Sequence, residues 1–155
     1  MNRKLSSFLL GGLVAGTLDI SYAILFSYFR SRISPVRILQ SVASGLLGRA
    51  AYSGGLKIAA LGLGLHFLIA FSATAVFFLG ARWLHILVRH PILSGMVYGI
   101  LVYAVMNRVV IPLSRVPPRA APPALVIVIT GLLVHLFFIG VPIALASRRA
   151  YATAG

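Results

Sequence analysis

The sequence predicts an all-α integral membrane protein with four transmembrane helices, and two observations carry that prediction. First, 60% of its 155 residues are hydrophobic and only 10% are charged, against roughly 25% charged residues in ordinary soluble domains. Second, four apolar stretches reach the length of roughly 20 residues that a helix needs to cross a bilayer. They cover residues 5–29, 58–79, 92–113 and 124–146. We interpret residues 1–155 as a single membrane domain.

The first apolar stretch begins like a secretory signal peptide. Arg3 and Lys4 precede it, and small residues occur within it at Ala15 and Gly16. The stretch nevertheless continues to Phe29, which is longer than the hydrophobic region of a usual signal peptide. We therefore expect it to be retained as a transmembrane helix.

Residues 34–50, between the first and second stretches, predict a helix of a different kind. Ser34 can cap its N-terminus, and Pro35 suits the first helical position. At about 100° per residue, aliphatic side chains fill one side of this helix and polar side chains fill most of the other. The aliphatic residues are Val36, Ile38, Leu39, Val42, Ala43, Leu46 and Leu47, and the polar ones are Arg37, Gln40, Ser41 and Ser44. We predict an amphipathic helix in the membrane interface, with a re-entrant or gating element as the alternative.

The charge of the chain points to lipid as its partner. There are 14 Lys and Arg residues against one acidic residue, a formal net charge of +13. Nearly all the basic residues lie at the ends of the apolar stretches or in the links, where they would meet headgroups. We expect the bilayer and its anionic lipid headgroups as partners, and no nucleic acid. Self-association into a homo-oligomer stays open, and so does the orientation, because the basic residues divide almost evenly between the two sides.

The two halves of the sequence resemble each other. Residues 10–16 (LGGLVAG) match 93–99 (LSGMVYG), and residues 62–68 (GLGLHFL) match 131–137 (GLLVHLF). We interpret the halves as two similar hairpins related by an axis along the membrane normal. Chance is the competing explanation, since apolar helices repeat Gly, Leu and Val freely. The expected helix-packing positions are Gly12, Gly16, Gly95 and Gly99.

Asp19 is the only acidic residue of the chain, and it lies in the middle of the first apolar stretch. A carboxylate at bilayer depth costs at least about 2.5–3.5 kcal/mol, so such a residue normally faces a partner, a cavity or a proton path. Gly12, Gly16 and Asp19 follow one stripe of the helix. We therefore expect Asp19 to point into the bundle and to mark a buried polar centre.

Arg108 is the simplest partner for Asp19. It is the only basic residue well inside an apolar stretch, and the two residues lie at similar depth if both spans run the same way. An ion pair would make both charges tolerable. However, Arg108 lies on the opposite side of its helix from Gly99. The alternative is that Arg108 extends toward the headgroups and leaves Asn107 closer to the interior.

His66 and His135 complete the set of polar residues expected in the spans, each with a glycine four residues earlier. Three interpretations compete. They are hydrogen-bonded core residues, or a proton relay with Asp19 that supports ion-coupled transport, or paired axial ligands of a haem.

Five stretches spread over most of the chain carry a family resemblance. They are residues 12–20 (GLVAGTLDI), 37–48 (RILQSVASGLLG), 61–69 (LGLGLHFLI), 105–107 (VMN) and 140–145 (GVPIAL). In these stretches the chain resembles uncharacterised bacterial four-span inner-membrane proteins similar to the YagU-like families. The resemblance implies a bacterial inner-membrane location and a four-span fold, but no assigned activity and no site residues.

We expect a small transporter or permease-like membrane protein, or an accessory membrane subunit of one, with its polar centre at Asp19. The alternatives are a non-catalytic structural or assembly protein with a buried Asp19–Arg108 pair, and a haem-binding electron carrier. We do not expect an enzyme, because no GxSxG or HExxH motif is present and one carboxylate excludes paired-carboxylate chemistry. With no cysteine and one acid, zinc and di-iron sites lack ligands, so haem is the only cofactor considered.

Overall fold

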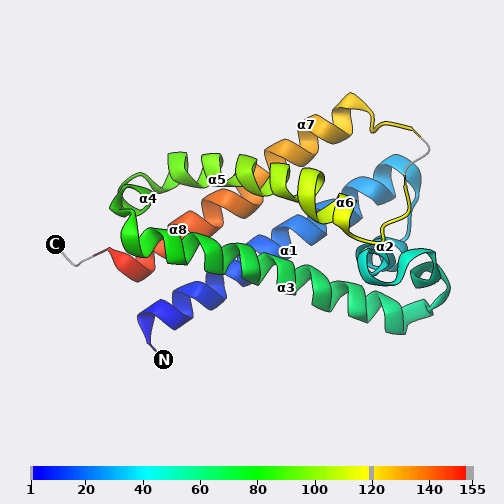
Figure 1. Ribbon diagram of the computed structural model, residues 1–155, viewed down its shortest axis with the longest axis horizontal. Coiled ribbons are helices and arrows are strands. Elements are labelled where there is room, and N and C mark those ends of the chain that lie inside the picture. Colours follow the sequence, from blue (N-terminus) through cyan, green and yellow to red (C-terminus); the bar gives the residue numbers. More distant parts are fainter. Residues whose placement is uncertain (1, 119–120, 153–155) are drawn as a thin grey trace.

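A computed structural model describes residues 2–118 and 121–152, and all of its regular structure is helical (Figure 1). Four helical segments are long and apolar enough to cross a membrane, which confirms the predicted all-α class with four apolar spans. They are α1 (Arg3–Ser31), α3 (Gly55–Trp83), α5 to α6 (Pro91–Leu113) and α7 to α8 (Leu125–Tyr151). The shorter helices between them are α2 (Pro35–Leu47), the 3₁₀ helix η1 (Gly48–Ser53) and α4 (His85–Arg89).

The third and fourth spans each widen into a π-helical turn. The third consists of α5 (Pro91–Val105), the π turn η2 (Met106–Val110) and α6 (Ile111–Leu113), and the fourth of α7 (Leu125–Val134), the π turn η3 (His135–Gly140) and α8 (Val141–Tyr151). Just after each π turn comes a proline, Pro112 or Pro142. Proline donates no N–H and its ring crowds the carbonyl four residues earlier. The wider turn accommodates the proline inside a membrane helix, and such turns frequently occur at functional sites.

The bundle has two distinct ends (Figure 1). The N-terminal end of α1, the C-terminal end of α8 and α4 lie at one end, whereas α2 and the link before α7 lie at the other. Helix α1 packs against α3, α8 and η3, and α5 packs against η3 and α8. The two sequence halves are therefore joined through α1 and α8. Their relation as two similar hairpins stays a prediction.

The four glycines expected at packing positions all lie at contacts with a neighbouring helix. Gly12 and Gly16 on α1 face phenylalanine rings of α3. Gly95 and Gly99 on α5 lie directly against the backbone of the fourth span around η3, where an added Cβ would overlap main-chain atoms. The α5–η3 crossing is therefore the closest backbone approach among these contacts, and it depends on the absence of side chains.

Helix α2 begins as predicted, with the Ser34 hydroxyl accepting the N–H of Arg37 at 3.3 Å and proline at the first position. The burial of its side chains differs from what a helical wheel predicts. Gln40 and Ser44, on the polar side of the wheel, are buried, whereas Leu46 is exposed. The reason is close packing against α3, where Gly62 lies against the backbone of α2. The interfacial position of this helix stays a prediction.

Helices α3 and α5 spread apart, and Tyr98 bridges them. A cavity of about 380 Å³ lined almost wholly by apolar side chains lies between the two helices. The Tyr98 hydroxyl donates a hydrogen bond to the Ala73 carbonyl at 2.6 Å, and its ring packs edge-on against Phe77 with centroids 5.0 Å apart. Tyr98 therefore fixes the separation of α3 and α5 on one side of this cavity.

We expect Tyr98→Phe to lower the free energy of unfolding by about 1 kcal/mol, the net contribution of a typical hydrogen bond. The ring contact with Phe77 is kept, so only the link to Ala73 is lost. Reversible SDS unfolding in lipid bicelles, followed by circular dichroism, measures the change. Tyr28→Phe on the exposed part of α1 is the matched control, and equal stability of the two variants would contradict a bridging role for Tyr98.

Candidate functional site

A cavity of about 320 Å³ lies among α1, α2, α3 and the third and fourth spans. Five polar side chains line it, contributed by all four spans: Asp19, His66, Tyr103, Asn107 and His135. The rest of the lining is small or aliphatic, with Val42 from α2 and Pro123 from the link before α7 marking its far end. This cavity contains the Asp19 carboxyl group and two histidines, whereas the lining of the cavity between α3 and α5 contains no acidic residue and no histidine.

Asp19 sits near the middle of its span. It lies 16 residues after Arg3 and 12 before Ser31 in α1, which places about 24 Å and 18 Å of helix on its two sides at 1.5 Å per residue. Its side chain is 24% exposed, and it faces the cavity and not the neighbouring core. A carboxylate at this depth is therefore accommodated by a cavity and polar neighbours.

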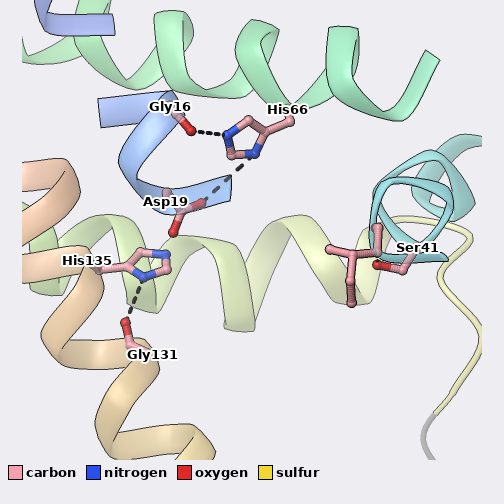
Figure 2. Close-up of polar contacts among 7 residues, drawn as sticks. Gly16, Asp19, Ser41, His66, Gly131 and His135 are labelled. Atoms are coloured by element: carbon pink, nitrogen blue, oxygen red, sulfur yellow. Dashed lines mark hydrogen bonds and ion pairs between the residues drawn. The ribbon is translucent and has the colours of Figure 1, made fainter. Parts of the chain in front are cut away.

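The two histidines flank Asp19. Figure 2 shows Asp19 between the imidazole rings, with one carboxylate oxygen directed at His66 and the other on the side of His135. The His66 Nδ1 atom lies 3.9 Å from Asp19 Oδ2. Asp19 therefore faces the cavity from α1, and α3 and η3 each contribute one histidine beside it.

Backbone carbonyls determine which ring nitrogens carry hydrogen. His66 Nε2 lies 2.8 Å from the Gly16 carbonyl, and His135 Nδ1 lies 2.8 Å from the Gly131 carbonyl. A carbonyl oxygen only accepts, so both of these nitrogens donate. In a neutral ring the other nitrogen then carries a lone pair. For His66 that nitrogen is Nδ1, the atom that faces Asp19.

This geometry makes Asp19 and His66 a candidate pair for holding one proton, since His66 Nδ1 and Asp19 Oδ2 face each other at 3.9 Å. Two acceptors facing each other, a carboxylate oxygen and an imidazole lone pair, repel unless a proton is bound to one of them. The pair is therefore stable either as a carboxylate with an imidazolium or as a carboxylic acid with a neutral imidazole. Either form would hold one proton near the middle of α1.

Tyr103 and Asn107 extend the polar region along the third span. The Tyr103 ring packs edge-on against His135 with centroids 5.2 Å apart, and the Asn107 side chain donates to the Tyr103 carbonyl at 2.9 Å. Asn107 had been expected near the interior in one of the two alternatives for this span. Tyr103 was missed, although it lies four residues before Asn107 and therefore on the same helical face.

Arg108 is not brought to Asp19. The only acid–base pair within the described residues joins Asp19 to His66. Arg108 lies on the exposed surface of η2 and does not line the cavity. It is one residue beyond Asn107, about 100° further around the helix. Both residues are exposed, but only Asn107 lines the cavity. The arrangement matches the alternative in which Arg108 extends away from the interior.

The cavity is asymmetric along the bundle. Beyond Asp19, toward the end that holds the termini, the interior is filled by a packed cluster of Ala15, Phe77, Ala81, Ile143 and Ala144. Toward the other end the lining continues past the polar residues to Val42 and Pro123. The lining of the cavity therefore extends toward the α2 end, whereas packed apolar side chains fill the interior toward the opposite end.

The described residues contain no group of three or more His, Asp, Glu or Cys side chains that could hold a metal ion. Paired haem ligation would require both histidines to present a free nitrogen to one iron. Asp19 lies between the rings (Figure 2), and His66 Nε2 is engaged with the Gly16 carbonyl. This donor arrangement does not fit a macrocycle between the two histidines.

The fold and the cavity define a multi-pass membrane protein with a polar cluster inside its helix bundle. No protein-family model matches the chain, and neither the curated proteins nor the solved structures compared with it give a match. The resemblance to YagU-like proteins therefore stays a prediction, and the functional argument depends on the cluster itself.

Proposed function

We propose that the protein is a small proton-coupled transporter or permease-like protein, or an accessory membrane subunit of one, in a bacterial inner membrane. Asp19, His66 and His135 would hold the coupling proton. The observation that carries this proposal is the convergence of three titratable side chains, Asp19, His66 and His135, from three different spans on one cavity. Asp19 lies near the middle of α1, so we place this cavity near mid-bilayer. Ionisable groups at that depth typically mark ion or proton pathways.

The asymmetry of the cavity supports the same proposal. A carrier exposes its central site to one side of the membrane at a time. A lining that extends toward α2, with packed apolar side chains toward the opposite end, fits such a site. The prolines and π turns in the third and fourth spans supply places where those helices can bend. Motion of α7 and η2 about these turns would change which end of the cavity is closed.

A structural role for a buried Asp19–Arg108 pair has less support. Such a pair needs contact between the two side chains, and Arg108 is exposed and outside the cavity. A carboxylate that faces a cavity retains a costly charge in the span without a packing benefit. A function that uses the charge accounts better for its presence.

The proposal is tested with purified protein in liposomes that carry an imposed pH gradient. Cationic, neutral and anionic solutes are added together, and their accumulation is measured by mass spectrometry. We expect accumulation of at least one solute to depend on the gradient and to vanish when a protonophore collapses it. Accumulation that matches protein-free liposomes for every solute class would contradict proton-coupled transport.

A further inference from the structure

We propose that the Asp19 cavity is a binding site for an organic monocation with an apolar body, taken up in exchange for the proton shared by Asp19 and His66. This inference deepens the proposed function and rests on it for the physiological use of the site. The binding itself follows from three features of the cavity: its charge, its hydrogen-bonding groups and its apolar walls.

The charge of the cavity is opposite to that of the protein. The chain carries 14 Lys and Arg residues, yet none of them is among the residues that line this cavity. Sites for carboxylates or phosphates are typically built from Arg or Lys. Here Asp19 is the only acidic group. Once the proton that it shares with His66 has left and both histidines are neutral, the cavity carries a single negative charge.

The hydrogen-bonding groups also select for a cation. Both histidines use one ring nitrogen to donate to a backbone carbonyl, which leaves a lone pair on the other nitrogen of each neutral ring. Together with the carboxylate these form a cluster of acceptors. The Tyr103 ring lines the same cavity, and an aromatic face attracts a cation within about 6 Å of its centroid.

The remaining walls favour an apolar body. Most of the lining consists of alanine, valine, isoleucine and proline side chains. Four residues, Ile69, Ala73, Val102 and Met106, are shared with the second cavity between α3 and α5. One layer of apolar side chains therefore separates the site from the cavity between α3 and α5. A volume of about 320 Å³ lies at the lower end of the range for small-ligand pockets, roughly 300–1,000 Å³.

The exchange balances in charge and atoms. Before binding, the Asp19 carboxylate faces the His66 imidazolium, or equivalently the acid faces the neutral ring, and the pair is neutral. The incoming cation replaces the proton beside the carboxylate, His66 becomes neutral, and a proton leaves to water. No covalent bond other than the N–H or O–H bond breaks, and the cluster again has no net charge.

The test uses benzyltrimethylammonium, which has no N–H and so cannot itself release a proton. The wild-type protein in nanodiscs is titrated in weak buffer containing a pH-indicator dye, and binding is measured by calorimetry. We expect saturable binding with release of a proton for each bound cation.

Two kinds of control accompany this titration. The neutral isostere neopentylbenzene should release no proton. Asp19→Asn should weaken cation binding by at least about tenfold, or about 1.4 kcal/mol. Thr130→Val, at an α7 residue that does not line the cavity, should leave binding unchanged.

A second variant, His66→Gln, keeps the proposal testable if Asp19→Asn fails to fold. His66→Gln keeps the carboxylate, so it should still bind the cation, but the proton released at a given pH should differ from that of the wild type. Equal binding of the neutral isostere, proton uptake on binding benzoate, or full cation affinity in Asp19→Asn would each overturn the proposal. Cation binding with proton release but without gradient-driven transport would leave this inference standing and overturn the proposed function. Gradient-driven transport of a neutral or anionic solute without cation binding would overturn this inference and leave the proposed function standing.

Discussion

Asp19→Asn is expected to abolish gradient-driven accumulation while leaving the fold intact. The substitution preserves the size of the side chain but removes the only carboxylate of the cavity. The two histidines remain, but without the carboxylate the Asp19–His66 pair can no longer exchange its proton for a substrate. The residue is partly exposed to the cavity, and its nearest charged neighbour is a histidine at 3.9 Å. We therefore expect the free energy of unfolding to change by less than about 1 kcal/mol, as for weak ion pairs.

Arg108→Gln supplies the comparison that separates function from structure. If Asp19 and Arg108 do not touch, the stability effects of the two substitutions should add within about 0.5 kcal/mol. A buried pair broken on one side typically costs about 3–5 kcal/mol, and the double variant would recover part of that loss. Strong coupling of this kind, with unchanged transport in Asp19→Asn, would favour the structural alternative.

Gly99→Leu is expected to disrupt the bundle more than any other single substitution considered. An added Cβ at Gly99 would overlap the carbonyl group of His135 and lie against the backbone of Leu136. Backbone atoms cannot rotate aside, so α5 and η3 would have to separate. We expect a loss of about 3 kcal/mol or more, at the upper end of the usual cost of overpacking, measured by SDS unfolding in bicelles.

Gly64→Leu is the matched control for that substitution. Gly64 is also a glycine inside a spanning helix, but it is exposed and an added Cβ there meets nothing within 4 Å. We expect its stability to stay within about 0.5 kcal/mol of the wild type, as for surface changes away from special features. A similar loss in both variants would show that leucine is disfavoured at any glycine of these helices and would remove the evidence for a close crossing.

The fold class was predictable because its signals are local. Length and hydropathy identify the four spans, and their ends moved by only a few residues, as at residues 58–79 against Gly55–Trp83. The π turns were not predicted, although Pro112 and Pro142 were visible signals for a disturbed helix. The burial of Gln40 on α2 depends on contact with α3, and a helical wheel contains no information on such a contact.

The candidate site was predictable in its members but not in its pairing. Composition singled out Asp19, and the search for polar residues inside spans added His66, His135 and Asn107, all of which line one cavity. Depth counting paired Asp19 with Arg108 because it measures position along the membrane normal and ignores rotation about the helix axis. The Gly16 and Gly131 carbonyls, which set the histidine hydrogens, have no sequence signal.

The central claim is that Asp19 exchanges a proton inside the cavity, and infrared difference spectroscopy tests it most directly. Asp19 is the only acidic side chain of the chain, so its carboxylic acid band needs no isotope label for assignment. We predict that acidification of the reconstituted protein produces a side-chain carboxylic acid band, that Asp19→Asn lacks it, and that benzyltrimethylammonium removes it from the wild type. A carboxylate that stays ionised over the whole accessible pH range and ignores the cation would contradict the claim.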